Sequence, residues 1–257
     1  ATQRPGIKAL ILAAGLVQGK IGAGDISFML GPRLNAAGRI DDALLSYQLL
    51  LADDFQAARG LADTLNQANR RRQELTKEIQ VLARQQVEDL GKQANRIVVL
   101  DSAGYPAGLV GLVAAKLVEE LSRPVLMLER GPETSRGSAR SVPGFNMIEA
   151  LTACEDLFVR YGGHSAAAGF TIVTERLREL EARLLDYAAA HLPDEMLTPA
   201  LEIDADVPLS ALATDLRSGA LPDFALVVPN QWNDMHTDHR LAPCAAGPVI
   251  DDELCQG

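Results

Sequence analysis

The chain has 257 residues, of which 47% are hydrophobic and 4% aromatic, and its formal net charge at pH 7 is −10. This apolar content is sufficient for a packed core and excludes wholesale disorder. Residues 193–257 hold 12 acidic and 2 basic residues, whereas residues 1–192 hold 22 of each. The acidity therefore belongs to the C-terminal region and does not argue against an anion-binding site upstream.

The cysteine pattern and the hydropathy exclude two other classes. Cys154, Cys244 and Cys255 are an odd number at wide spacing, so they predict neither a disulfide framework nor a zinc knuckle. No apolar run approaches the ~20 residues needed to cross a bilayer. The apolar stretch Ala9–Val17 lacks the small-x-small cleavage site of a signal peptide. We therefore expect a cytoplasmic protein with no membrane partner.

The first half of the chain predicts helices. Apolar residues recur at helical spacing over Ile7–Val17 and over Asp41–Leu51. Between them, Phe28–Arg39 contains Pro32 and two glycines, so we expect irregular backbone there. Asp53–Leu90 contains no proline and predicts one helix of about 55 Å, begun by Asp53 or Asp54 and ended at Gly91. Its length favours a bridge between two lobes over a coiled-coil arm, because its apolar residues keep no strict heptad.

The second half predicts a compact α/β domain over residues 92–192. Short apolar runs predict strands, and longer periodic segments predict helices. We expect strands at Arg96–Asp101, Pro124–Glu129, Ser135–Val142 and Ala168–Val173, helices at Ala107–Leu121, Asn146–Tyr161 and Thr174–His191, and a turn at residues 162–164. Leu201–Val207 is a candidate further strand, and periodicity is lost beyond Pro208.

Arginines in two segments are suited to bind phosphate. Pro32–Arg39 carries Arg33, Asn35 and Arg39, and guanidinium forks with free backbone N–H groups bind phosphate well. The alternative is a structural loop whose arginines pair with carboxylates. In the second segment, residues 135–142, an extended strand would place Arg136, Ser138 and Arg140 on one face, with Ser141 next to them. The alternative there is an edge strand protected by charge.

Two glycine-rich segments are further candidates. Gly162 and Gly163 permit an anion-binding nest of backbone N–H groups and place His164 where it can donate to an oxyanion. In the segment 104–115, glycines could expose a helix N-terminus to an anion, but close helix–sheet packing explains Gly108 and Gly111 equally well. That segment matches neither the Walker nor the dinucleotide pattern. The arginines at 70–72 on the long helix are most simply a solvated face.

These motifs, in this order, resemble the C-terminal half of the RecJ exonucleases of the DHH phosphoesterase superfamily. The resemblance covers about residues 5–191. It rests on GPRLNAAGRI at 31–40, the long Gln/Asn/Arg-rich helix, GYPAGLVGLVAAKL at 104–117, RPVLML at 123–128, GSARSVPGFNMIEAL at 137–151 and YGGHSAAAGF at 161–170. The last motif is typical of the wider DHH-associated domain, and PRLNAAGR is more specific to RecJ.

The resemblance implies a two-lobed α/β enzyme. Residues 1–52 would be the end of the DHH catalytic lobe, residues 53–91 the bridging helix, and residues 92–192 the DHH-associated domain with a mixed sheet. Residues 193–257 would be an acidic tail that begins as an OB-like region and is then unassigned. The resemblance implies that Asn35 and Arg39 line the cleft from the end of the first lobe and that Ser138, Arg140, Gly163 and His164 hold the strand from the other side. Together with the residue patterns above, it gives the candidate phosphate- or nucleic-acid-binding residues Arg33, Asn35, Arg39, Ser138, Arg140, Ser141, Gly162, Gly163 and His164.

The chain departs from the family in its metal ligands. It contains no DxD pair followed by a His-His dipeptide, and metal-dependent phosphodiester hydrolysis needs such a cluster of carboxylates and imidazoles. We therefore expect no catalytic residue and no metal site in this chain, with Mn²⁺ or Mg²⁺ bound only in the intact enzyme. A second departure is the segment 232–257, which does not resemble the OB-type domain that follows in the family.

The predicted function is the substrate-gripping part of a single-stranded-DNA-specific 5′–3′ exonuclease of repair and recombination. The intact enzyme would be monomeric, and single-stranded DNA would be its partner. Two alternatives stay open. One is a DHH phosphoesterase acting on oligonucleotides or cyclic dinucleotides, and the other is a non-catalytic nucleic-acid-binding module.

Overall fold

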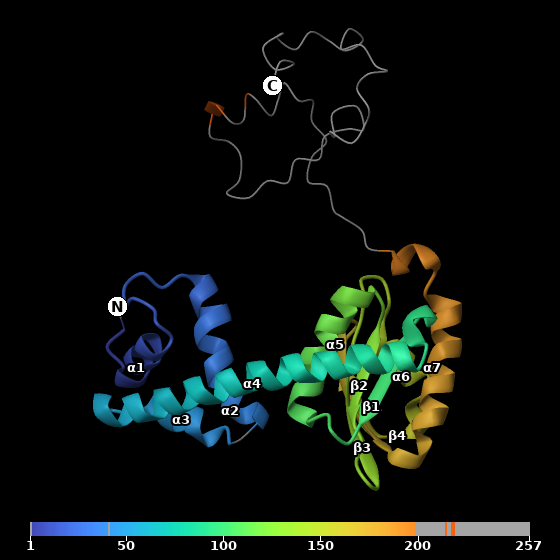
Figure 1. Cartoon of the computed structure of the whole chain (residues 1–257), viewed down its shortest axis with the longest axis horizontal. Helices are drawn as coiled ribbons and strands as arrows, with labels where there is room; N and C mark the ends of the chain where they lie inside the picture. Colours follow the sequence, from blue (N-terminus) through green and yellow to red (C-terminus); the bar gives the residue numbers. More distant parts are fainter. Residues whose placement is uncertain (1, 41, 199–213, 215–216, 219–257) are drawn as a thin grey trace. The chain divides into compact units, whose positions relative to one another are not determined.

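The computed structural model describes residues 2–40, 42–198, 214 and 217–218. Residues 1–200 form one compact unit, in which a helical part is joined to an α/β part (Figure 1). The expected strand at 201–207 and the unassigned segment 232–257 lie outside the described residues. The helices are α1 (Pro5–Ala13), α2 (Gly31–Ile40), α3 (Leu44–Leu51), α4 (Phe55–Asp89), α5 (Ala107–Leu121), α6 (Met147–Thr152) and α7 (Leu177–His191).

The helical part has its own core, formed where α1, α2 and α3 pack on the first half of α4. Helix α1 ends four residues earlier than expected, because Gly15 takes a left-handed conformation with φ of 73°. Leu10, Leu49 and Leu65, from α1, α3 and α4, are fully buried in this core. These helices therefore hold one another through a shared apolar cluster.

The expectation of irregular backbone at residues 28–39 is wrong. A π-helix, Asp25–Leu30, runs directly into α2, so this segment is helical throughout. Proline normally disrupts a helix because it lacks an N–H group and its ring meets the carbonyl four residues earlier. Here the wider π-turn precedes Pro32, and the Gly31 N–H group bonds to the Ile26 carbonyl, five residues back. The change of helical register accommodates the proline.

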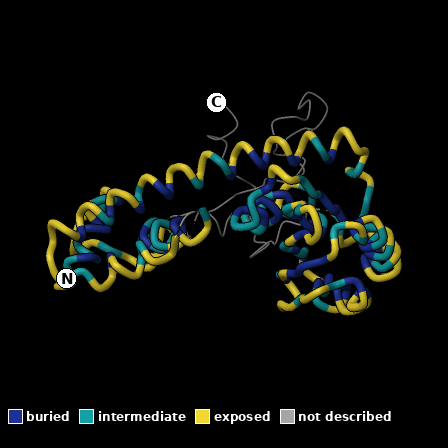
Figure 2. The backbone as a smooth tube through the Cα atoms, turned by 90° about the horizontal axis from the view of Figure 1, so that it is seen from below, coloured by how far each residue is buried: buried dark blue, intermediate teal, exposed yellow. Residues whose placement is uncertain are grey.

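The long helix α4 is confirmed. It has 35 residues, which corresponds to about 52 Å. The Asp54 carboxylate caps its start by accepting a hydrogen bond of 2.7 Å from the Ala57 N–H group, and Gly91 follows its end with φ of 62°. Figure 2 shows buried and exposed residues alternating along it. Its first half packs in the helical core and its second half against α5 and the sheet, so one rigid element joins both parts.

The α/β part is built on one mixed sheet of five strands in the order β1-β2-β3-β5-β4. Strands β1 and β2 are parallel, and all other neighbours are antiparallel. The strands are β1 (Val98–Ser102), β2 (Val125–Glu129), β3 (Thr134–Arg140), β4 (Phe158–Gly163) and β5 (Ala167–Val173). Helices α4 and α5 cover one face of the sheet, and α6 and α7 cover the other. The predicted α/β fold with a mixed sheet is therefore confirmed.

The predicted helix at 146–161 is largely wrong. Helix α6 ends at Thr152, and Phe158 begins strand β4. Aromatic and β-branched residues favour a strand, and Phe158 packs edge-on against Phe170 of β5 with ring centroids 5.2 Å apart. The predicted turn at 162–164 is also displaced, because residues 162 and 163 complete β4. The connection between β4 and β5 is formed by residues 164–166.

Candidate phosphate-binding site

Two glycines on α5 bring the end of α2 and strand β3 together. A Cβ atom on Gly108 would lie 2.0 Å from the carbonyl oxygen of Arg39, at the end of α2. A Cβ atom on Gly111 would lie 2.8 Å from Ser138 Oγ and 2.9 Å from Arg140 Nη2. The two glycines are three residues apart and so lie on one side of α5. Close packing therefore explains both glycines, and this packing positions Arg39 beside Ser138 and Arg140.

Arg39 reaches across the junction between the helical part and the α/β part. Its Nη1 group donates a hydrogen bond of 3.2 Å to the Gly108 carbonyl, and its side chain is otherwise exposed. Asn35 precedes it by one helical turn on α2 and is also exposed. Both side chains can therefore contact a ligand at this junction.

Arg140 is half-buried beneath α5. Its Nη1 group donates to Ser138 Oγ at 2.9 Å and to the Ala139 carbonyl at 2.7 Å. Burial lowers the pKa of Arg140, and the nearby positive charge of Arg39 lowers it further. The guanidinium groups of Arg39 and Arg140 and the Ser138 hydroxyl thus lie close together. Ser138 and Arg140 project from one face of β3, as predicted.

Arg72 of α4 lies near Arg39 and adds a third guanidinium to this group, although it was predicted to lie on a solvated face. Its Nε group donates to Asn69 Oδ1 at 3.2 Å. Burial, followed by the charge of Arg39, lowers the pKa of Arg72. The prediction of a solvated face holds for Arg70 and Arg71, which are exposed, but not for Arg72. A signal was present, because Arg72 continues the buried row that includes Asn69 and Thr76 at helical spacing.

No carboxylate neutralises these three arginines within the part of the chain that the structure describes. Arg39, Arg72 and Arg140 form no ion pair there, and their hydrogen bonds go to neutral oxygens. Among residues 2–40 and 42–198, five other arginines are paired with carboxylates, namely Arg84, Arg96, Arg130, Arg176 and Arg183. Like charges gathered in this way repel one another, and an anion between them removes the repulsion. The cluster of Arg39, Arg72, Arg140 and Ser138, called the arginine cluster below, is therefore suited to bind an anion.

The structure does not bring Arg33 into the arginine cluster. Its Nε group donates to Asn66 Oδ1 at 2.9 Å, and its Nη1 group donates to the Met29 carbonyl at 2.7 Å. Burial lowers the pKa of Arg33, and the charge of Arg70 lowers it further. Arg33 is therefore held against α4 at a different place from Arg39.

The end of β4 lies in register with Arg140. Arg140 pairs with Ala167 across β3 and β5, and the His164 N–H group donates to the Ala167 carbonyl at 2.9 Å. His164 is exposed, and its Nδ1 atom accepts a long hydrogen bond of 3.4 Å from the Ala166 N–H group. When Nδ1 accepts a hydrogen bond, the neutral imidazole carries its proton on Nε2. The Nε2–H group can then donate to an oxyanion. His164 is thus two strands away from Arg140 at the same end of the sheet.

The two glycines before His164 have a different role from the expected anion nest. Gly162 and Gly163 are strand residues, and successive N–H groups of a strand point in opposite directions. A Cβ atom on Gly163 would lie 2.4 Å from the Ala167 carbonyl oxygen and 2.5 Å from the Ala168 Cα atom. Gly163 is therefore required for the close approach of β4 to β5.

Ser141 forms hydrogen bonds to two loop segments of the protein. Its hydroxyl group donates to the Phe145 carbonyl at 2.7 Å, and its N–H group donates to the Ala166 carbonyl at 2.9 Å. Both donors are used within the protein, whereas a phosphate oxygen needs a free donor. Ser141 thus fixes the position of the β4–β5 connection.

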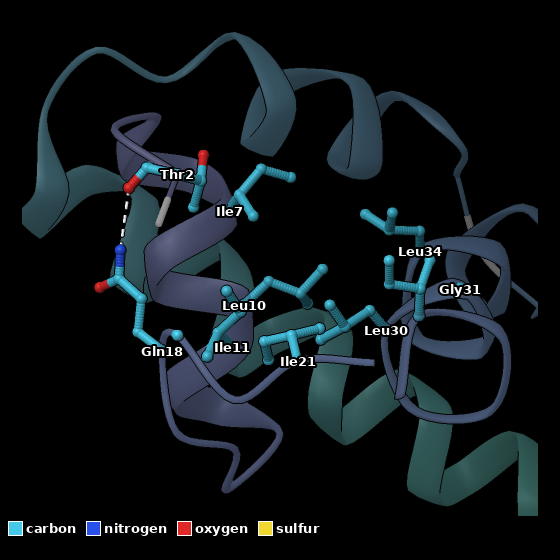
Figure 3. Close-up of a pocket in the computed structure, with 11 residues that line it drawn as sticks. Thr2, Ile7, Leu10, Ile11, Gln18, Ile21, Leu30, Gly31 and Leu34 are labelled. Atoms are coloured by element: carbon cyan, nitrogen blue, oxygen red, sulfur yellow. Dashed lines mark hydrogen bonds between the residues drawn. The ribbon is translucent and has the colours of Figure 1, made fainter. Parts of the chain in front are cut away.

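An apolar cavity of about 480 Å³ lies in the helical part, away from the arginine cluster (Figure 3). Side chains of α1, the π-helix and α2 line it, among them Ile7, Leu10, Leu30 and Leu34. Its polar border includes a hydrogen bond of 2.8 Å from Gln18 Nε2 to the Thr2 carbonyl. It offers no charged group to a phosphate.

Neither a metal site nor a membrane span is found in the described part of the chain. No three side chains of His, Cys, Asp or Glu gather there in a way that could hold a metal ion. None of the helices described combines the length and the apolarity needed to cross a bilayer. The arginine cluster itself does not fit a cation, because its donor groups are positively charged.

Comparisons with known proteins agree with the sequence resemblance. Residues 94–190 match the DHHA1 domain. The chain is 38% identical over 205 residues to the single-stranded-DNA-specific exonuclease RecJ of Bacillus subtilis, an alignment that covers 79% of this chain and 26% of that protein. It is 32% identical over 276 residues to RecJ of Salmonella typhimurium, covering 96% of this chain and 47% of that protein.

A solved structure is similar as well. The crystal structure of Thermus thermophilus RecJ with Mg²⁺ aligns with a TM-score of 0.67 and 32% identity, over 85% of this chain and 33% of that one. A second crystal structure of the same protein contains Mn²⁺. The chain thus spans about a quarter to a half of the length of these relatives.

Proposed function

Because residues 94–190 form a DHHA1 domain and the chain is homologous to part of the RecJ exonucleases, we propose that it grips the substrate of a single-stranded-DNA-specific exonuclease. The intact enzyme would degrade single-stranded DNA from 5′ to 3′ in repair and recombination. It would act in the cytoplasm as a monomer. The observation that carries the proposal is the arginine cluster, which has no carboxylate partner among the described residues.

Each part of the chain has a role in this proposal. Residues 1–52 belong to the end of the DHH catalytic lobe, residues 53–91 form the bridge, and residues 92–192 form the domain that holds the strand. Residues 193–257 begin an OB-like region. Divalent metal ions, which the Thermus thermophilus relative contains, would act in the intact enzyme. The described residues of this chain do not fit a metal, so they take part by holding DNA.

The arginine cluster would position one backbone phosphate. Guanidinium groups donate in pairs to phosphate oxygens, and Arg39 comes from α2 whereas Arg140 comes from β3. Ser138 and Arg72 complete the set, and the His164 imidazole would contact the strand from the end of β4. Holding the phosphate in a fixed place restricts the scissile bond to one geometry, which is how positioning accelerates a reaction.

Substitution of Arg140 tests the proposal. We expect Arg140→Ala to weaken the binding of a single-stranded oligodeoxynucleotide to the 257-residue chain by roughly 1–3 kcal/mol, the value of a hydrogen bond to a charged group. Fluorescence anisotropy measures the affinity. The melting temperature should not fall much, because the substitution removes a half-buried positive charge that Arg39 repels. Arg178→Ala is the control, because Arg178 is an exposed arginine on α7, at the other face of the sheet. Equal affinity for the wild type and Arg140→Ala would refute the phosphate site.

A further inference from the structure

Arg33, near the start of α2, uses two of its three guanidinium nitrogens within the protein. Its Nε group donates to Asn66 Oδ1 of α4 at 2.9 Å, and its Nη1 group donates at 2.7 Å to the carbonyl of Met29, in the π-helix. A guanidinium group is planar and holds its N–H donors in fixed directions. Arg33 therefore fixes the π-helix, α2 and α4 relative to one another.

The contact between Arg33 and Asn66 is the only side-chain hydrogen bond between α2 and α4 in the part of the chain that the structure describes. The buried residues of α2 are Ala36 and Ala37. Their methyl groups allow the two helices to approach closely, but they are too short to interlock with the side-chain ridges of α4. The Arg33–Asn66 contact therefore adds a restraint along the helix axis that the alanines do not provide.

The same spacing on both helices relates this contact to the arginine cluster. On α2, Arg39 lies six residues after Arg33. On α4, Arg72 lies six residues after Asn66, and Arg72 is close to Arg39. Six residues correspond to a rise of about 9 Å along either helix, so one register of α2 along α4 satisfies both pairs. A slip of one residue, about 1.5 Å and 100°, would also break the hydrogen bond from Arg39 to the Gly108 carbonyl.

The arginine cluster needs such a restraint, because its charges repel one another. Arg39 on α2 and Arg72 on α4 have no carboxylate partner among the described residues. Their repulsion acts to separate the end of α2 from α4. Arg33 opposes this separation from less than two turns away, and a neutral amide is its acceptor on α4. The contact involves no attraction between opposite charges, so its contribution is one of geometry.

We propose that Arg33 is a positioning residue for the arginine cluster. Its hydrogen bond to Asn66 sets the register of α2 along α4, and this register holds Arg39 in the cluster. Arg33 and Asn66 thus act through Arg39 and do not contact the phosphate themselves. The inference rests on the proposed function, because only there does Arg39 bind a phosphate.

Asn66→Ala tests this role, because it removes the acceptor and changes no charge. Alanine is a better helix former than asparagine, so the chain should stay folded, and the melting temperature verifies this. We expect the affinity of the 257-residue chain for a single-stranded oligodeoxynucleotide to fall about tenfold. The slope of log affinity against log salt should fall by about 0.7, because one contact to a single-stranded phosphate, that of Arg39, would be lost. Unchanged affinity and slope would overturn the proposal.

Gln67→Ala is the matched control, because Gln67 is the exposed, uncharged neighbour on α4 and should leave both quantities unchanged. A double-mutant cycle with Arg39→Ala shows whether the effect passes through Arg39. In the Arg39→Ala background, Asn66→Ala should cause no further loss of affinity or slope. An equal loss with and without the Arg39 side chain would show that Asn66 acts by another route, and the proposal would be wrong.

Asn66→Asp distinguishes positioning from a direct contact of Arg33 with the strand. The aspartate keeps an acceptor oxygen for Arg33, so the register should be retained, but it also neutralises the guanidinium charge. Gln67→Glu adds the same charge at the neighbouring position. If Arg33 only positions α2, the two variants should bind DNA equally and with equal salt slopes. Weaker binding by Asn66→Asp than by Gln67→Glu would mean that Arg33 itself holds a phosphate, against the proposal.

Arg140→Ala separates the two levels of the argument. If it weakens binding while Asn66→Ala does not, the proposed function stands and the positioning role of Arg33 fails. If neither variant weakens binding, the proposed function itself fails. Loss of affinity in both, with the loss in Asn66→Ala dependent on Arg39, supports a cluster whose geometry is set by the Arg33–Asn66 contact.

Discussion

At the scale of single residues, the most informative feature is which arginines have no carboxylate partner among the residues that the structure describes. Arg39, Arg72 and Arg140 come from α2, α4 and β3, and neutral oxygens accept their hydrogen bonds. Arg183, by contrast, lies within 2.7 Å of Asp156 and serves the structure. The sequence alone does not distinguish these arginines. The fold shows which of them form ion pairs with carboxylates within the described residues and which do not.

Arg72 is the residue that the structure adds to the proposed site. We expect Arg72→Ala to weaken binding of single-stranded DNA by roughly 1–3 kcal/mol, since a guanidinium on the phosphate would be lost. Arg72→Lys should recover only part of the affinity, because an ammonium group cannot form a bidentate contact. Titration of an oligodeoxynucleotide against both variants measures this. Arg71→Ala is the matched control, because Arg71 is the exposed neighbour on α4.

The paired charges give a pH dependence of a known sign. Hydrogen bonds from Arg183 and Arg176 lower the pKa values of Asp156 and Glu179 respectively. A carboxylate with a depressed pKa stabilises the fold above its ordinary pKa, and this contribution is lost as the pH falls through the depressed value. We expect Arg183→Gln to lower the melting temperature at pH 7 and to matter less at strongly acidic pH. A difference that is constant from pH 7 to pH 2 would contradict this.

At this scale the sequence indicates candidate residues, and the structure shows which of them lie together. Arg39, Ser138 and Arg140 were all candidates, because short motifs place polar groups beside glycines, and the fold brings these three together around α5. The sequence could not show that the Ser141 hydroxyl donates to the Phe145 carbonyl, since this contact depends on the path of a loop. It did not place Arg72 in the candidate site, because the environment of a helix face depends on what packs on it.

At the scale of elements, the contact of α2 with α5 determines whether the arginine cluster exists. The Gly108 position has no room for a side chain, because the Arg39 carbonyl oxygen occupies that space. Arg39 also donates to the Gly108 carbonyl, so the two elements are joined by packing and by a hydrogen bond. Any group larger than hydrogen at this position would move α2 away from β3.

A pair of glycine substitutions tests this contact. Gly108→Ala should destabilise the chain by roughly 1–3 kcal/mol through overpacking and should also weaken DNA binding. Gly60→Ala is the control, because Gly60 is an exposed residue of α4 and its added Cβ atom would meet no atom of the described residues within 4 Å. This substitution should stabilise the helix by about 0.5–1 kcal/mol. Chemical denaturation measures both values. Similar stability in the two variants would show that α2 and α5 are not in close contact.

Elements with a strong local pattern were predicted well, and those decided by long-range pairing were not. The capping carboxylate and the uninterrupted helical composition of α4 are local signals, and its predicted ends are within two residues of those observed. Strand β4 was missed because it is stabilised by pairing with β5, and the periodicity of a short segment does not reveal a pairing with another strand. The π-helix before Pro32 was missed because proline normally indicates a break.

At the scale of the whole molecule, exposed apolar side chains gather in the helical part. They include Leu12, Val17, Ile26, Phe28 and Leu51, and Phe28 is 79% exposed. Several large apolar side chains exposed in one part of a protein indicate a covered interface. This supports the proposal that residues 1–52 belong to a larger catalytic lobe, which would cover these side chains.

We expect the 257-residue chain to associate with itself or to bind an apolar dye through this surface. Phe28→Ser should reduce dye fluorescence and association without lowering the melting temperature, because the side chain is exposed. Size-exclusion chromatography and dye titration measure the effect. A monomeric wild-type chain that binds no dye would contradict the expectation.

Helix α4 also has a consequence for how this architecture can change over time. Each added residue would turn everything beyond it by about 100° and lengthen the helix by 1.5 Å. An insertion of two full turns would nearly restore the rotation, but it would still pull Arg39 away from Gly108 by a distance that no hydrogen bond can span. The helix thus fixes the distance and the rotation between Leu65 in one core and Ile79 in the other. Descendants of this protein can exchange the exposed side chains of α4, but they should rarely gain or lose residues between these two points.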